Sequence, residues 1–221
     1  MTISSPALLT GPLILASTSP RRRALLERWE IPFEVIPSTV TEDVEGSIGP
    51  IEATTTLALR KAEAVPRNHR ADLVIGADTV VEHHGEILTK PIDVADARAM
   101  LARLRGHWHR VVTGLAVMDP ITGRREVSAV ITRVKLRNYS DRELARYIAS
   151  GEPMDKAGSY AIQGRGGRLV ELIDGCYNNV VGLPLCELAV ILRRFGWAPL
   201  LLHPVCTDQN GCPCPRVVNP G

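Results

Sequence analysis

The chain has 221 residues, a length that suits one large α/β domain or two small lobes. A hydrophobic fraction of 45% and a charged fraction of 23% are ordinary for a soluble globular protein. The net charge of +2 argues against broad binding of nucleic-acid polymers, so any electropositive site must be local.

The N-terminal segment does not fit a secretory signal. No Lys or Arg precedes its apolar stretch, Pro12 interrupts it, and the arginines follow it. No apolar stretch reaches the roughly 18 residues that span a membrane. The five cysteines are odd in number and irregular in spacing, which argues against a disulfide framework. We therefore expect a cytoplasmic protein with no membrane partner.

The first predicted strand, 13–17, leads through a Thr-Ser-Pro turn into a helix over 20–29. Ser19 suits the N-cap and Pro20 the first helical position, so the arginines at 21–23 fall in the first turn. A helix N-terminus carries partial positive charge, and each cation there costs or forgoes about 0.3–1 kcal/mol.

A bound phosphate would offset this unfavourable placement of cations at a helix N-terminus. Backbone N–H groups point outward at such a turn, Ser17 adds a hydroxyl, and the forks of Arg21 and Arg22 match phosphate oxygens. The alternative is that the arginines face solvent or nearby acids such as Glu27.

The remaining elements alternate between strands and helices, which predicts an α/β fold. In the first half we expect a strand over 33–38, an acidic loop, a helix over 50–65, and a buried strand from 73 that is broken at Gly76 and Asp78. A hairpin turning at His84-Gly85 follows, and then a helix that Asp93 caps and Gly106 stops. In the second half we expect a long hairpin turning at 119–123, a helix from the capping box Ser140–Glu143 to about Ala149, loop and strand over 151–175, and a last helix over 183–196.

Asp78 follows a buried strand at the place where α/β folds put their sites. It could hold a divalent cation, act as a general base, or only cap a turn. Hairpin pairing could bring Lys90 beside it, and Lys61 lies on the helix after the acidic loop. Glu42 and Asp43 in that loop could join Asp78 in a carboxylate cluster suited to Mg²⁺ or Mn²⁺. Solvated lysines and acids are the alternative.

The segment 155–167 carries a second group of polar and small residues, among them Asp155, Lys156, Gly158, Tyr160 and Gln163. Its glycines would let a ligand approach the backbone closely, and the amide of Gln163 could read the edge of a base. Tyr177 and Asn179 could line a cleft or only support the next loop.

Two possible metal sites are weak. His83 and His84 are neighbours in a tight turn and rarely converge, so we expect exposed turn residues. Cys206, Cys212 and Cys214 lack a fourth ligand, which favours reduced thiols on a tail.

Neither a Gly-x-x-x-x-Gly-Lys phosphate loop nor a Gly-x-Ser-x-Gly elbow occurs, which argues against a Walker-type ATPase and an α/β-hydrolase. Over about residues 13–195 the chain instead resembles the Maf family of nucleoside triphosphate pyrophosphatases, also called septum-formation inhibitor Maf-like proteins. The resemblance rests on motifs in the family's order: "LILASTSPRRRALLE", "PSTVTED", "LALRKAEA", "VIGADTVV", "GEILTKP", "DKAGSYAIQG" and "NVVGLPL".

The resemblance implies a Maf/ITPase-like α/β fold, a mixed twisted sheet with flanking helices and two lobes around a central cleft, commonly in a homodimer. We expect one such domain over 1–203 and a Pro/Cys-rich tail over 204–221. The family cleaves a nucleoside triphosphate between its α and β phosphates with a divalent metal cation, Mg²⁺ or Mn²⁺, and releases the monophosphate and pyrophosphate.

The resemblance also assigns residues. Asp78 matches the family's proton acceptor, Glu42 its metal-linked acid, and both would hold the metal. Phosphate-contacting positions match Ser17, Arg22, Lys61 and Lys90, of which Lys90 joins the catalytic group.

Three further positions separate branches of the family. The branch acting on dTTP and UTP has Arg, Thr and Gln there, as this chain has at Arg21, Thr79 and Gln163, whereas the 7-methyl-GTP branch has Trp, Gln and Glu. Thr41 departs from the family, which often has an acid there, although Asp43 could substitute.

Two alternatives stay open. One is a broader pyrophosphatase that also removes modified nucleotides. The other is a nucleotide-binding regulator of cell division without catalysis, which the acids and lysines disfavour because a pure binder needs no metal-bound base.

Overall fold

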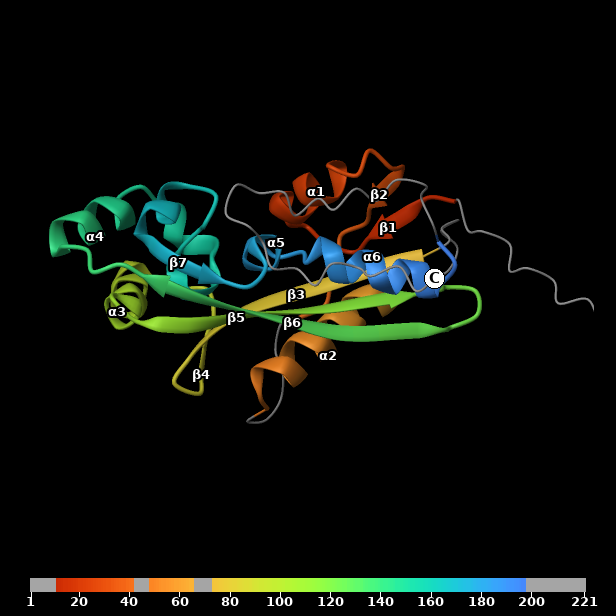
Figure 1. Ribbon diagram of the computed structural model, residues 1–221, viewed down its shortest axis with the longest axis horizontal. Helices are drawn as coiled ribbons and strands as arrows, with labels where there is room; N and C mark the ends of the chain where they lie inside the picture. Colours follow the sequence, from red (N-terminus) through yellow and green to blue (C-terminus); the bar gives the residue numbers. More distant parts are fainter. Residues whose placement is uncertain (1–10, 42–47, 66–72, 198–221) are drawn as a thin grey trace, which may run out of the picture.

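The computed structural model describes residues 11–41, 48–65 and 73–197 (Figure 1). They form a seven-stranded sheet in the order β2-β1-β3-β5-β6-β7, with β4 paired to β3. Its strands are β1 (Leu13–Leu15), β2 (Phe33–Val35), β3 (Leu73–His83), β4 (Glu86–Leu88), β5 (Trp108–Met118), β6 (Arg125–Leu136) and β7 (Val170–Asp174). The helices are α1 (Pro20–Glu27), α2 (Pro50–Glu63), α3 (Val94–Leu104), α4 (Asp141–Ile148), α5 (Tyr177–Val181) and α6 (Leu185–Arg194), with short 3₁₀ turns η1 (Glu152–Asp155), η2 (Ala157–Ser159) and η3 (Arg165–Leu169).

The sheet is mixed. Strands β2, β1 and β3 run parallel, whereas β3, β5, β6 and β7 pair antiparallel. Helix α2 covers one face, and α1, α5 and α6 lie over the other (Figure 1). Strands β1 and β3 are buried on both faces, as their nearly continuous apolar sequence predicts. These observations confirm the predicted mixed α/β fold.

The core is divided between the two ends of the sheet. Two apolar clusters pack β1 and β3 against α1 and α6 on one face and against α2 on the other. A third cluster packs the far ends of β5 and β6 against α3 and α4, around Leu101, Val134 and Tyr139.

Two glycines let α2 lie directly on the sheet. A Cβ atom at Gly76 would stand 2.0 Å from the carbonyl oxygen of Ala58, and one at Gly114 would stand 2.2 Å from the α2 backbone. The predicted break at Gly76 and Asp78 is therefore wrong, because β3 continues through both residues to His83. Gly76 serves a close helix contact here, not a turn.

The predicted helix starts are confirmed by their caps. Asp93 accepts a hydrogen bond from the backbone N–H of Asp96 at 2.7 Å, and Ser140 and Glu143 form the reciprocal capping box.

The short helix α5 was not predicted. His83 is also buried, contrary to the expectation of an exposed turn residue, because it still belongs to β3.

Several predictions concern residues that lie outside the described ranges. They are the loop acids Glu42 and Asp43, the boundary between the domain and the tail 204–221, and the three cysteines of that tail. No helix within the described ranges combines the length and the apolar character that crossing a membrane requires.

Candidate active site

Strand β3 has an open edge in its middle. β1 pairs with Leu73–Ile75 and β4 with Val81–His83, and no described strand pairs with residues 76–80 on that side. The backbone N–H of Ala16 donates to the carbonyl of Ile75 at 2.8 Å, after which the chain leaves β1 and turns into α1. The gap therefore gives a ligand access to side chains on both faces of β3.

A cavity of about 370 Å³ lies at this gap. Seven of the predicted site residues line it, namely Ser17, Arg21, Arg22, Lys61, Asp78, Thr79 and Lys90. Gln163 is exposed and is not among the lining residues, although its neighbour Ile162 is. Glu42 lies outside the described ranges.

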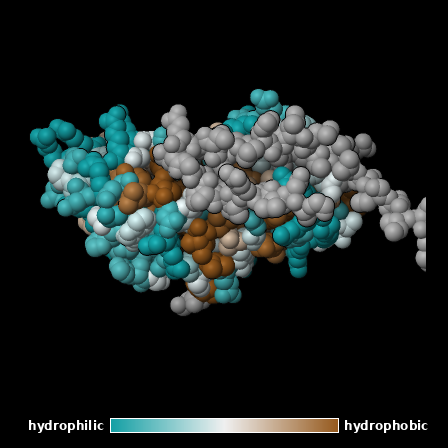
Figure 2. All heavy atoms as spheres, in the orientation of Figure 1, coloured by the Kyte–Doolittle hydropathy of each residue, from teal (hydrophilic) through white to brown (hydrophobic). Residues whose placement is uncertain are grey.

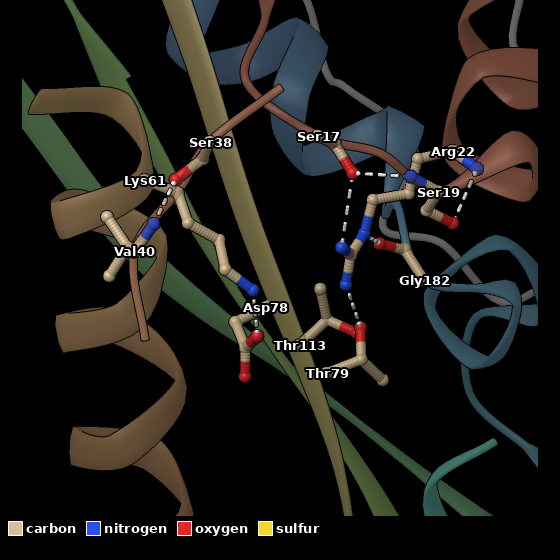
Figure 3. Close-up of polar contacts among 10 residues, drawn as sticks. All are labelled: Ser17, Ser19, Arg22, Ser38, Val40, Lys61, Asp78, Thr79, Thr113 and Gly182. Atoms are coloured by element: carbon tan, nitrogen blue, oxygen red, sulfur yellow. Dashed lines mark hydrogen bonds and ion pairs between the residues drawn. The ribbon is translucent and has the colours of Figure 1, made fainter. Parts of the chain in front are cut away.

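Asp78 forms a buried ion pair with Lys61 on the α2 side of the sheet (Figure 3). The ammonium Nζ lies 2.6 Å from Oδ1, and each side chain is 9% exposed. The close contact of α2 at Gly76 brings Lys61 over the strand, so the glycine helps to build the pair. Loss of one partner of a buried ion pair costs about 3–5 kcal/mol, because the other charge is left uncompensated.

Arg22 lies on the other side of β3, where Thr79 points (Figure 3). Its Nε donates to the carbonyl of Gly182 at 2.7 Å and one terminal nitrogen to Thr79 Oγ1 at 3.0 Å. The other terminal nitrogen lies 3.5 Å from Ser17 Oγ, and Thr79 bonds Thr113 at 2.9 Å. These acceptors are neutral, and together they fix the position of the guanidinium.

The three arginines of α1 separate in the structure. Arg23 pairs with Glu27 at 2.8 Å, as the alternative interpretation expected. Arg21 and Arg22 instead face the cavity, and Ser19 caps the helix by accepting from the backbone N–H of Arg22. The cationic first turn is therefore directed into the same cavity as Asp78.

Asp155 and Lys156 bring further charges to the cavity. Lys156 is hydrogen-bonded to Asp155, whose other oxygen lies 3.9 Å from a terminal nitrogen of Arg21. Partial burial acts to raise the pKa of Asp155, but the hydrogen bond and charge of Lys156 and the charge of Arg21 hold it below its usual value.

An apolar wall completes the cavity. Val111, Ile162 and Val180 line it together with the ring of Tyr160, whose hydroxyl bonds Nε2 of His109 at 2.7 Å. Burial lowers the pKa of His109 to about 3, so its ring is neutral near pH 7. Such a wall suits a planar, mostly apolar ring.

The sequence analysis did not predict the carbonyl of Gly182 or the pairing of Thr79 with Thr113, and it gave Tyr160 no role of its own. The contact between Arg22 and Gly182 spans 160 residues, so local spacing gives no signal for it. Of these features, the sequence could have indicated only the direction of the Thr79 side chain. Side chains alternate along a strand, so Thr79 must point to the face opposite that of its neighbour Asp78.

The described residues hold no group of three or more His, Cys, Asp or Glu side chains that could bind a metal ion. Of the carboxylates among the described residues, those of Asp78 and Asp155 line the cavity. Mg²⁺ is usually held by one or two carboxylates together with substrate phosphates. Asp78 is a donor of this kind, and phosphate oxygens of a substrate would complete the set of ligands.

The chain is similar to known proteins along most of its length. The Maf family, described as Maf-like protein, matches residues 12–195. Relatives named dTTP/UTP pyrophosphatase include those of Dictyoglomus thermophilum (47% identical over 189 residues, 85% of this chain and 98% of the relative) and Gloeobacter violaceus (48% over 187 residues, 85% and 97%). The relative from Salinibacter ruber is 49% identical over 186 residues, 84% of this chain and 91% of its own length.

Among solved structures, a nucleoside-triphosphatase / dITP/XTP pyrophosphatase from Mycobacterium abscessus aligns with a TM-score of 0.36 and 15% identity, over 57% of this chain and 74% of that one. Similarity this low supports no argument about this chain.

Proposed function

This chain belongs to the Maf family, and we propose that it hydrolyses dTTP and UTP to the nucleoside monophosphate and pyrophosphate. Relatives of this name match it along almost their whole length. One structural observation carries the proposal: the arginine-rich first turn and the Asp78–Lys61 pair share one cavity at the open edge of β3.

The charges of the cavity suit a polyphosphate. Besides Arg22 and Lys61, the side chains of Arg21, Lys90 and Lys156 line it. A triphosphate carries several negative charges, and preorganised cations stabilise both its binding and the charge that develops in the reaction.

Asp78 is the proposed general base. As a water molecule attacks the α-phosphorus, Asp78 accepts its proton, and the bond from the α-phosphorus to the oxygen bridging to the β-phosphate breaks. The water oxygen stays on the monophosphate, and the leaving group is pyrophosphate. The cations hold the phosphate chain so that the attacking and leaving oxygens lie in line.

A divalent cation held by Asp78, Glu42 and phosphate oxygens would supply further neutralisation of phosphate charge. Arg21 and Thr79 in the cavity, with Gln163 beside Ile162, are the proposed selectivity residues. The apolar wall around Tyr160 suits the base or the sugar.

We also infer a homodimer from the family resemblance. Large apolar side chains are exposed on β6 and β7, among them Val127, Ile131 and Leu172 at 42%, 41% and 50%. Hydrophobic residues gather over the middle of one face of the molecule (Figure 2). Exposed apolar surface of this kind is typical of subunit contacts.

A panel of nucleoside triphosphates, assayed for pyrophosphate with and without a chelator, tests the proposal. We expect one pyrophosphate per monophosphate, fastest turnover with dTTP and UTP, and loss of turnover with the chelator. Orthophosphate release would overturn the proposal. Equal turnover of modified nucleotides would favour the broader enzyme, and tight binding without turnover the regulator.

A further inference from the structure

Arg21, Asp155 and Lys156 form a charged group in the cavity, and its two cations are not yet assigned to particular phosphates of the substrate. The side chain of Lys156 is only 12% exposed, whereas that of Asp155 is 71% exposed. The carboxylate of Asp155 lies between two cations, bonded to Lys156 through one oxygen and 3.9 Å from Arg21 through the other. All three side chains line the cavity.

The backbone after Lys156 is fixed in a conformation that few residues adopt. Gly158 has φ +67° and Ser159 has φ +62°. Val81 leaves no room for a side chain at Gly158, since a Cβ atom would lie 2.9 Å from it. The N–H of Gly158 donates to the carbonyl of Thr89 at 3.2 Å, next to Lys90. The turn thus holds Lys156 in a set place in the cavity.

The cluster and the proposed base lie on different sides of β3. Gly158 packs on Val81, which by alternation shares a face with Thr79, the partner of Arg22. Asp78 and Lys61 lie on the α2 face. When the α-phosphorus of a polyphosphate reaches Asp78 through the open edge, its outer phosphates still need binding partners. The cluster offers two cations for them in the same cavity.

We propose that Arg21 and Lys156 form a subsite for the β and γ phosphates of the substrate, and that the Asp155 carboxylate occupies this subsite until the phosphates displace it. Carboxylate and phosphate oxygens accept the same charge-assisted hydrogen bonds, but a phosphate offers more oxygens and more charge. Asp155 can leave at little cost because it is mostly exposed. This inference rests on the proposed function and adds Lys156 to its substrate-binding residues.

The test is calorimetric binding of three probes to the full chain: the non-hydrolysable α,β-methylene-UTP, pyrophosphate and UMP. Asp155→Asn keeps the shape of the side chain and removes the competing charge. It is expected to tighten binding of the first two probes by about three- to fivefold. Lys156→Gln is expected to weaken both by about tenfold or more. UMP affinity should not change in either variant.

Asp174→Asn is the matched control, because Asp174 is an exposed aspartate that pairs with Arg133 at 3.5 Å outside the cavity. It should leave all three affinities unchanged. Weaker or unchanged analogue binding in Asp155→Asn, with the wild type binding the analogue, overturns the subsite but not the proposed function. Failure of the wild type to bind any of the three probes overturns both.

Discussion

Replacing Asp78 by Asn keeps the shape of the side chain and removes its charge, so it should lower both the turnover and the stability of the protein. Loss of a general base lowers turnover by about 10²–10⁴-fold. The same change takes the counter-charge from Lys61, whose ammonium lies 2.6 Å from the carboxylate in a pair that is 9% exposed on each side. A buried pair of this kind loses about 3–5 kcal/mol of unfolding free energy when one partner is removed.

A second substitution, at Lys61, should restore the stability of the Asp78→Asn variant but not its activity. For a domain of this size each kcal/mol corresponds to about 2–4 °C in Tm, so Asp78→Asn should melt roughly 6–20 °C below the wild type. The double variant Asp78→Asn/Lys61→Met replaces the remaining charge by an apolar chain and should regain most of that difference. Both variants should remain inactive in a pyrophosphate-release assay.

Binding should survive in Asp78→Asn, because a negative charge has been removed from a site that receives phosphates. Calorimetry with α,β-methylene-UTP is expected to show an affinity at least equal to that of the wild type. Turnover close to the wild-type rate in either variant would refute the role of Asp78, and an unchanged Tm in the single variant would refute the energetic account of the pair.

Three other predictions concern packing, selectivity and pH. Gly76→Ala forces a Cβ atom to within 2.0 Å of the Ala58 carbonyl, so thermal melts should show a loss of about 1–3 kcal/mol or more, and an unchanged Tm would contradict the close contact of α2. Gln163→Glu should reduce UTP turnover far more than 7-methyl-GTP turnover in steady-state assays, and equal losses would count against base reading by Gln163. The hydrogen bonds from Arg137 and from the Ser140 cap lower the pKa of Glu143 from 4.5 to about 2. The ionised Glu143 side chain therefore stabilises the folded state fully above pH 4.5, and this contribution is lost as the pH falls toward 2. Urea unfolding of wild type and Glu143→Gln should accordingly differ at pH 7 and converge near pH 2; a difference independent of pH would contradict this assignment.

Local signals predicted much of the fold. Ser19, Asp93 and Ser140 cap their helices as expected, because a cap depends on a few neighbouring residues. The error at Gly76 has the opposite origin. Glycine indicates a turn from sequence alone, whereas here it makes room for a helix that begins 26 residues earlier at Pro50.

Part of the candidate site was predictable from the sequence, but its arrangement was not. Arg21, Arg22, Asp78 and Lys61 were expected near one another, and all four line one cavity. Alternation along β3 divides these groups between its two faces, and the open strand edge that joins them in one cavity is revealed only by the pairing of the strands. Arg23 pairs with Glu27 and does not line the cavity, and this difference from Arg21 and Arg22 likewise depends on the orientation of α1.

The central claim is that water attacks the α-phosphorus of a triphosphate held in this cavity with Asp78 as the base. Hydrolysis of UTP in water enriched in ¹⁸O, followed by mass spectrometry of both products, tests it most directly. We expect one labelled oxygen in UMP and none in pyrophosphate. Label in pyrophosphate, or release of orthophosphate carrying the label, would contradict it.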